Sequence, residues 1–81
     1  MDEKQILDRV NELVHEEHTL RDRYAAGQLD AEEEQLRLRQ LEESLDQCWD
    51  LLRQRRARQA AGENPDEAQP RPVSQVENYL Q

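Results

Sequence analysis

The residues whose spacing first suggests chemistry are Glu12, His15 and His18 in the stretch "NELVHEEH". Glu12 and His15 have the Glu-x-x-His spacing with which two-fold di-iron bundles supply metal ligands from one helix. At about 100° per residue, however, both side chains project away from the apolar positions of the same segment. His15 and His18 are spaced i, i+3, which differs from the His-Glu-x-x-His zinc motif. We therefore predict a solvated face here, with no metal and no cofactor.

The single cysteine, Cys48, is a candidate catalytic nucleophile. Such a thiol needs a base close by, and neither histidine falls on the same face or at the facing level. Cys48 instead follows an apolar repeat, where cysteine usually acts as a small buried hydrophobic residue. The sequence therefore offers no catalytic residue, and we expect a protein that is not an enzyme.

A basic group lies near the end of the second apolar repeat: Arg53, Arg55, Arg56 and Arg58. At the C-terminal end of a helix, such cations complement the helix dipole, and here they would also face Asp2 and Glu3. The alternatives are contact with an anion, either a nucleic acid or an acidic protein partner. The net charge of −8 repels phosphate backbones, so we expect nucleic-acid binding less than the structural role.

Trp49 and Glu17 adjoin or interrupt the apolar repeats. A tryptophan beside such a repeat is typical of a core or dimer contact rather than a platform for a ligand. For Glu17 three interpretations stay open. It pairs with Arg37 or Arg39 across the seam between two helices, it forms a polar layer that fixes their register, or it turns to the edge toward solvent.

Composition and periodicity predict that helices position all these residues. Charged residues make up 37% of the 81 residues and hydrophobic residues 35%, and there are one tryptophan, two tyrosines and no phenylalanine. Apolar positions recur every three or four residues over 3–26 and again over 31–61. Gly27 follows the first repeat, Asp30 is placed to cap the second, and Gly62 follows it. We therefore predict an all-α fold with helices at about 3–26 and 31–61.

The connection between the two predicted helices is short, so they should fold back as an antiparallel, coiled-coil-like hairpin over residues 1–62. The numbers of facing residues then sum to about 57. This register brings apolar positions together: Leu13 with Leu45, Val10 with Cys48, and Ile6 with Leu51 or Leu52.

Residues 63–81 contain all three prolines and few apolar groups, so we expect an irregular tail that is either mobile or a strap against the surface. Its last residues differ, because Ser74 and Glu77 have the spacing of a capping box. Val76, Tyr79 and Leu80 could then form one apolar turn of a short terminal helix.

One hairpin leaves too much apolar surface for two helices to bury, because the apolar arc of the first helix is wider than one partner helix covers. We therefore predict a homodimer that forms a four-helix bundle, unless the terminal turn caps the hairpin as a third element. The expected interface residues are Ile6, Val10, Leu13, Val14, Leu20, Leu38, Leu41, Leu45, Trp49 and Leu52.

The acidic charge also disfavours anionic lipid surfaces, and no apolar run reaches the length of a membrane span. The start of the chain lacks the pattern of a secretory signal. We expect a cytoplasmic protein without membrane contact.

The block "LDQCWDLLRQRRARQAAGENPDEAQPRP", followed by "VENYLQ" and preceded by "ILDRVNELVHEEHTLR", resembles a small actinobacterial family of unknown function, number 2630. The resemblance covers essentially the whole chain. It implies a soluble intracellular protein and brings no activity, cofactor or catalytic residue with it. Our hypothesis is a non-enzymatic helical interaction or adaptor protein with an unknown protein partner. The alternative is a nucleic-acid-associated or ribosome-associated protein that binds through the Arg53–Arg58 end.

Overall fold

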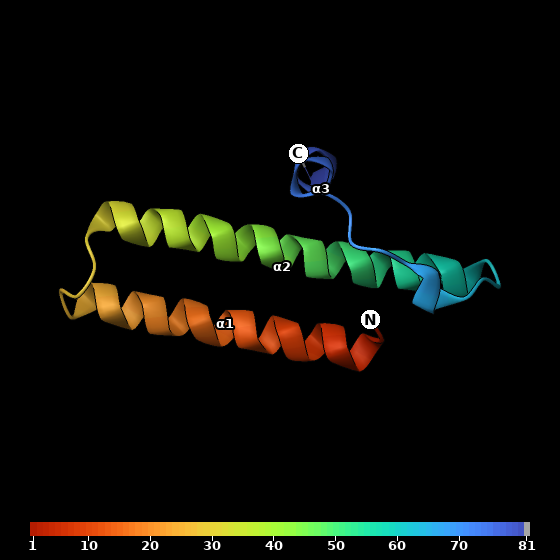
Figure 1. Cartoon of the computed structure of the whole chain (residues 1–81), viewed down its shortest axis with the longest axis horizontal. Coiled ribbons are helices and arrows are strands. Elements are labelled where there is room, and N and C mark those ends of the chain that lie inside the picture. Colours follow the sequence, from red (N-terminus) through yellow and green to blue (C-terminus); the bar gives the residue numbers. More distant parts are fainter. Residues whose placement is uncertain (81) are drawn as a thin grey trace.

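The computed structural model describes residues 1–80, with the side chains of residues 1–77, and it is all-helical within them. Two long helices, α1 (Glu3–Ala25) and α2 (Ala31–Ala60), run antiparallel as a hairpin (Figure 1). A 3-10 turn, η1 (Pro65–Glu67), and a short helix, α3 (Val73–Leu80), follow. The molecule measures 51 × 26 × 14 Å, and the predicted all-α fold with two long helices is confirmed.

Both long helices begin at an aspartate cap. The Asp2 carboxylate accepts a hydrogen bond from the Gln5 amide at 2.8 Å, and the Gln5 side chain accepts one from the Asp2 amide at 2.9 Å. At α2 the Asp30 carboxylate accepts from the Glu33 amide at 2.8 Å. These bonds satisfy backbone donors that the first turn of a helix leaves unpaired. Gly27 adopts a φ of +75° just past α1, which allows the chain to turn back into α2.

The hairpin register follows the predicted sum of about 57. Ile6, Leu51 and Leu52 belong to one buried cluster, and Cys48 packs against it. At the open end of the hairpin, the Arg55 guanidinium donates a hydrogen bond to the Met1 carbonyl at 2.8 Å. Apolar seam positions buried on both helices therefore set the alignment of α1 with α2.

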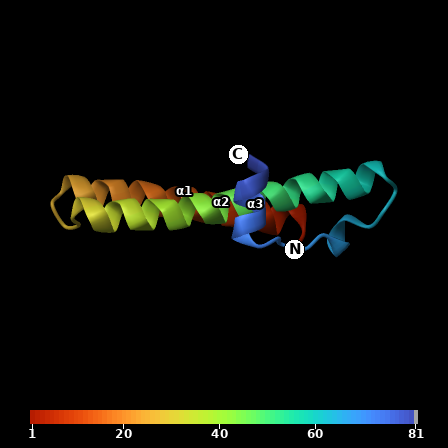
Figure 2. The ribbon, with the colours of Figure 1, turned by 90° about the horizontal axis from the view of Figure 1, so that it is seen from above.

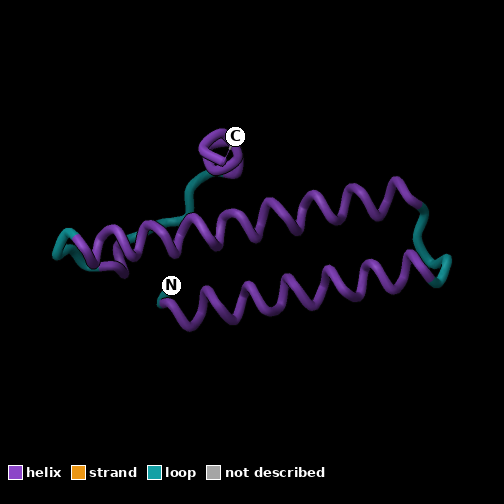
Figure 3. Tube along the Cα trace, turned by 180° about the vertical axis from the view of Figure 1, so that it is seen from behind, coloured by secondary structure: helices purple, strands orange, loops and turns teal. Residues whose placement is uncertain are grey.

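The segment from Gly62 to Pro72 forms a strap that returns along the hairpin (Figures 1 and 3). Ala68 is buried in the same cluster as Ile6 and Leu51. The strap then leads into α3, which crosses α2 on the side opposite α1 (Figures 1 and 2). Of the two predicted alternatives for this segment, the structure has the strap against the surface.

The short terminal helix starts differently from the prediction. Helix α3 begins at Val73, directly after Pro72, and the Pro72 carbonyl accepts from the amides of Gln75 and Val76. Ser74 therefore lies inside the helix rather than at its cap, and the predicted capping box is wrong. Val76 is fully buried, while the side chains of Tyr79 and Leu80 lie outside the described residues.

Candidate docking surfaces

The candidate metal and nucleophile residues remain apart. Within residues 1–80, no cluster of histidine, cysteine and carboxylate side chains is placed to hold a metal ion. The Glu12 carboxylate instead pairs with Arg9 of its own helix at 3.2 Å, and both histidines are exposed. Cys48 is half-buried, and burial raises the pKa of its thiol, with Arg9 opposing part of the rise. A raised pKa disfavours the reactive thiolate.

The basic group of the second helix is largely engaged within the chain. Arg55 is buried and pairs with Asp66 of η1 at 2.8 Å, in addition to its bond to the Met1 carbonyl. Arg58 lies 3.4 Å from Glu63 and 3.7 Å from Glu67. The carboxylates that reach these cations thus come from the strap and not from Asp2 or Glu3 as predicted. Charge pairs with Arg55 and Arg58 therefore anchor the strap to the end of α2, and the N-terminus contributes the Met1 carbonyl rather than an acidic side chain.

Arg53, the first member of the basic group, contacts a different carboxylate, and Arg56 is exposed. The Arg53 guanidinium lies 3.7 Å from Asp50, whose side chain is completely buried. Asp50 also forms a two-armed ion pair with Arg71 of the strap, and Gln54 donates to it at 3.0 Å. The hydrogen bonds from Arg71 are the main reason that the pKa of Asp50 is lowered, with Gln54 contributing and burial opposing.

Two glutamines extend this anchor along the same face of α2. Gln47 donates to the Arg71 carbonyl at 3.1 Å, and Gln54 donates to the Gln69 carbonyl at 2.9 Å. Sequence reasoning missed the whole anchor, because Asp50 and its neighbours follow no apolar period. The available signal was the i, i+3, i+7 spacing of Gln47, Asp50 and Gln54, which places three polar side chains on one helix face.

Glu17, in the middle of the apolar stripe of α1, turns to the edge. Its carboxylate pairs with Arg21 of the same helix at 3.1 Å and keeps 30% of its side chain exposed. The interpretation in which it reaches Arg37 or Arg39 across the seam is wrong, and the edge interpretation describes its position.

The residues predicted as an interface divide into two sets. The first set is buried inside the single chain: Ile6, Val10, Leu13, Leu20 and Leu52. The second set is only partly covered or exposed: Val14, Leu38, Leu41, Leu45 and Trp49. Val14 is 41% exposed and Trp49 44%. The seam and the strap account for the first set, while the second set has surface left over.

Most of this second set lies on one side of the hairpin. On α1, Leu7 and Val14 are seven residues apart and flank the buried row Ile6–Leu13–Leu20 on the edge opposite the row Arg9–Glu16–Arg23. On α2, Leu38 and Leu45 form the corresponding edge, with Trp49 beside them. We call the five apolar residues on this side of the hairpin the uncovered stripe: Leu7, Val14, Leu38, Leu45 and Trp49.

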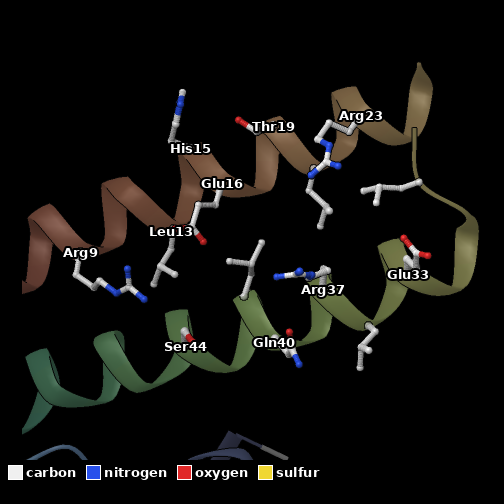
Figure 4. A pocket seen from close by; sticks show the side chains of 14 residues that line it. Arg9, Leu13, His15, Glu16, Thr19, Arg23, Glu33, Arg37, Gln40 and Ser44 are labelled. Atoms are coloured by element: carbon white, nitrogen blue, oxygen red, sulfur yellow. The ribbon is translucent and has the colours of Figure 1, made fainter. Parts of the chain in front are cut away.

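The opposite side of the hairpin carries the strap and, nearer the loop, an open groove of about 810 Å³. The strap lies on this side, where Pro70 lines a small hollow together with Arg9, Ser44 and Gln47. Beyond it, Leu13, Leu20, Leu29, Leu36 and Leu41 line the groove. In Figure 4 the guanidinium groups of Arg9, Arg23 and Arg37 point toward the space between the helices, while His15 points away. Leucines beside guanidinium groups suit contact with another amphipathic segment rather than a chemical step.

A sequence model of the family described as "Protein of unknown function (DUF2630)" matches residues 2–81. The chain belongs to this family. Curated proteins similar to this chain include an uncharacterized protein of Mycobacterium bovis and uncharacterized proteins of two Mycobacterium tuberculosis strains. Each is 48% identical over 77 residues, which cover 95% of this chain and 88% of the relative. No solved structure matches the chain.

Membership in this family confirms the resemblance drawn from the sequence. Among the described residues, no helix combines the length and the apolar character that crossing a bilayer demands.

Proposed function

We propose that the protein is a non-enzymatic helical interaction protein of the cytoplasm, which acts as a homodimer joined through the uncovered stripe. The observation that supports this is the exposure of Leu7, Val14 and Trp49, each above 40%, on the side of the hairpin away from the strap. Exposed apolar side chains gathered on one side of a small protein commonly mark a protein interface. Tryptophan is enriched among the residues that dominate binding energy at such interfaces.

A second copy of the chain fits the stripe better than an unrelated surface for two reasons. The stripe runs along both α1 and α2, so two hairpins placed face to face form a four-helix bundle. The positions that continue the stripe along each helix also carry charges of both signs. On α1, Arg21 lies seven residues after Val14, and on α2, Glu42 lies seven residues before Trp49. A two-fold interface brings the same patch to itself and therefore needs both signs.

Sedimentation of the wild-type protein and a Trp49→Glu variant tests the proposal. We expect a wild-type dimer and a variant that sediments as a monomer with unchanged helical circular dichroism. Leu36→Glu is the matched control, because Leu36 is 56% exposed and lines the groove on the other side. The control should stay a dimer. A wild-type protein that is monomeric up to about 100 µM, a tenfold excess over a low-micromolar dissociation constant, would remove the dimer.

The alternative function, binding of nucleic acid or the ribosome through Arg53–Arg58, has less support. Arg53, Arg55 and Arg58 are each within 4 Å of a carboxylate of the same chain. Salt-sensitive RNA binding at low ionic strength that weakens when Arg55 and Arg56 are both replaced by alanine would favour it over the homodimer.

A further inference from the structure

The open groove beyond the strap is a second surface that the hairpin leaves uncovered. Its apolar lining consists of leucines from both helices and the loop between them: Leu13, Leu20, Leu29, Leu36 and Leu41. Leu13 and Leu20 are buried in the seam, whereas Leu36 is 56% exposed. Pro70 lines the neighbouring hollow, and no residue of the strap lines the groove itself. The strap therefore leaves the loop half of this side open.

Two arginines that line this groove have no partner within the described chain. Among residues 1–77, no group forms an ion pair with the guanidinium of Arg23 or Arg37 or accepts a hydrogen bond from it. Glu16 and Glu33 also line the groove, and neither pairs with an arginine. In Figure 4 both guanidinium groups point toward the space between the helices. The groove thus presents unpaired positive charge beside leucines, in a chain whose net charge is −8.

The two unpaired cations come from opposite walls of the groove. Arg23 lies on α1 and Arg37 on α2, and the register of the hairpin places them within one helical turn of the same level. A carboxylate bound between them is able to contact both guanidinium groups, each of which offers several donors. Arg9, the third arginine of the groove, already pairs with Glu12 at 3.2 Å. The groove therefore favours a ligand that carries carboxylates at the level of Arg23 and Arg37.

Shape and backbone chemistry favour a helix as this ligand. Along α1 the groove runs from Arg9 to Arg23, a span of about 21 Å at the rise of an α-helix. The walls are helices, whose backbone groups are bonded internally, so they offer no sheet edge to an extended peptide. An amphipathic helix satisfies its own backbone and lays a row of apolar side chains on the leucines. A nucleic acid supplies the negative charge without such a row.

A second copy of this chain is a poor fit to the groove. The α1 wall carries the row Arg9–Glu16–Arg23, in which one negative charge lies midway between two positive charges. A two-fold axis that overlaps the whole groove with itself places Glu16 opposite Glu16 and arginine opposite arginine. Like charges placed opposite each other disfavour such a complex. The occupant of the groove is therefore a different chain.

We propose that the groove binds an acidic amphipathic helix of another protein. The apolar side chains of this helix pack on the leucines of the groove, and its carboxylates lie between Arg23 and Arg37. The proposal goes beyond the homodimer and does not depend on it, because the uncovered stripe lies on the opposite side of the hairpin.

Selection from a display library of helical peptides tests the groove. Each peptide has about 18 residues, roughly 27 Å of helix, which is enough to span the groove. Leucine is fixed at a spacing of three and four residues, and the flanking positions vary among glutamate, lysine and glutamine. We expect the peptides enriched on the wild-type protein to carry glutamate at the flanking positions. Fluorescence anisotropy then measures their affinity, which should weaken as the salt concentration rises.

Replacement of both unpaired arginines, Arg23→Gln with Arg37→Gln, should weaken binding of the enriched peptides about tenfold, because two partly exposed ion pairs are lost. The matched control is Arg39→Gln with Arg56→Gln, which removes the same two charges from exposed positions outside the groove. This control should keep the wild-type affinity. Circular dichroism should show the same helix content in all three proteins.

The Trp49→Glu variant separates the groove from the homodimer. It alters the uncovered stripe alone, so it should bind the enriched peptides with the wild-type affinity. If this variant remained a dimer while the Arg23 and Arg37 double variant lost the peptides, the homodimer through the stripe would fail and the groove proposal would stand.

Three results would overturn the groove proposal. The first is a selection without enrichment of glutamate-bearing peptides. The second is equal affinity of the enriched peptides for the wild type and for the Arg23 and Arg37 double variant. The third is a wild-type dimer that the peptides dissociate, which would assign the groove to a second copy of the chain.

Discussion

The two long sides of the hairpin are finished in different ways. On one side the chain covers part of its apolar surface: the strap buries Ala68 against Ile6 and Leu51 and is held by the Asp50–Arg71 pair. On the other side the uncovered stripe leaves Val14 and Trp49 more than 40% exposed. Both sides begin from the same problem, which is that two helices cannot bury a wide apolar arc alone.

The contrast shows how a small chain divides its apolar surface. The strap contributes few apolar side chains and is fixed mainly by polar groups whose geometry is specific, including a buried ion pair and two glutamine-to-carbonyl bonds. Polar anchors of this kind define one position for the strap without adding much apolar area. The aliphatic and aromatic side chains on the other side remain accessible to a second molecule, and that division is the basis of the proposed dimer.

The largest expected effect comes from truncating a leucine that the strap covers, compared with an exposed leucine in the groove on the same side of the hairpin. Leu51 is 4% exposed and contacts both α1 and the strap, so Leu51→Ala should lower the free energy of unfolding by about 3 kcal/mol. Leu36→Ala, at an exposed position in the groove, should cost under about 1 kcal/mol. Urea unfolding followed by circular dichroism measures both. Equal losses would mean that the part covered by the strap is no better packed than the groove.

Replacement of the buried anchor should come next in size. Asp50→Asn removes the charge that Arg71 and Gln54 both contact, and we expect a loss of about 2 kcal/mol. This figure is below that of a fully buried pair, because the Arg71 side chain is 34% exposed and partly screened by solvent. Hydrogen exchange should also show that the strap amides lose protection while α1 keeps it.

Asp8→Asn is the control for this substitution, since Asp8 forms an exposed pair with Lys4 at 3.4 Å and should cost under about 0.5 kcal/mol. If Asp50→Asn cost no more than the control, the strap would be held by Ala68 and its apolar neighbours rather than by the ion pair.

Acid should weaken the strap before it weakens the seam. The pKa of Asp50 is lowered in the folded protein. Its ion pair therefore stabilises the fold fully at pH values above the ordinary aspartate pKa, and this stabilisation is lost as the pH falls through the lowered pKa. We expect the free energy of unfolding to fall in this range in the wild type and to fall less in Asp50→Asn. Parallel acid profiles for the two proteins would show that Asp50 does not control the anchor.

The sequence predicted the parts of the molecule that repeat. Heptad-like spacing gave the two long helices and their register, since Ile6, Leu51 and Leu52 meet as expected. The aspartates before each helix predicted the caps, because the donors of a first turn need a local acceptor. These features depend on neighbours in the sequence or on a period, and both are visible in a single chain.

The parts that the sequence did not predict depend on contacts between distant residues with no period. Arg55 reaches Asp66 and the Met1 carbonyl rather than the acidic N-terminal side chains, because the strap returns along the hairpin and brings its own carboxylates. Ser74 and Glu77 do not close a capping box, because α3 starts at Val73 and Ser74 lies inside the helix. The predicted interface was also divided by the strap, whose path no local pattern specifies.

The smallest expected effect concerns the two glycines that follow the long helices, Gly27 at the loop end of the hairpin and Gly62 at its open end. Gly27 and Gly62 both have a φ of +75°, and a Cβ added at either would contact nothing within 4 Å. Alanine should therefore cost only the backbone strain of the left-handed conformation, about 1 kcal/mol at each position.

The two variants should differ in the segment that each turn positions. Gly27→Ala should lower global stability alone, whereas Gly62→Ala should also reduce amide protection in the strap, because Gly62 directs the chain toward Asp66 and Arg71. Identical hydrogen-exchange maps for the two variants would show that the strap finds its place from its side-chain anchors without the turn that precedes it.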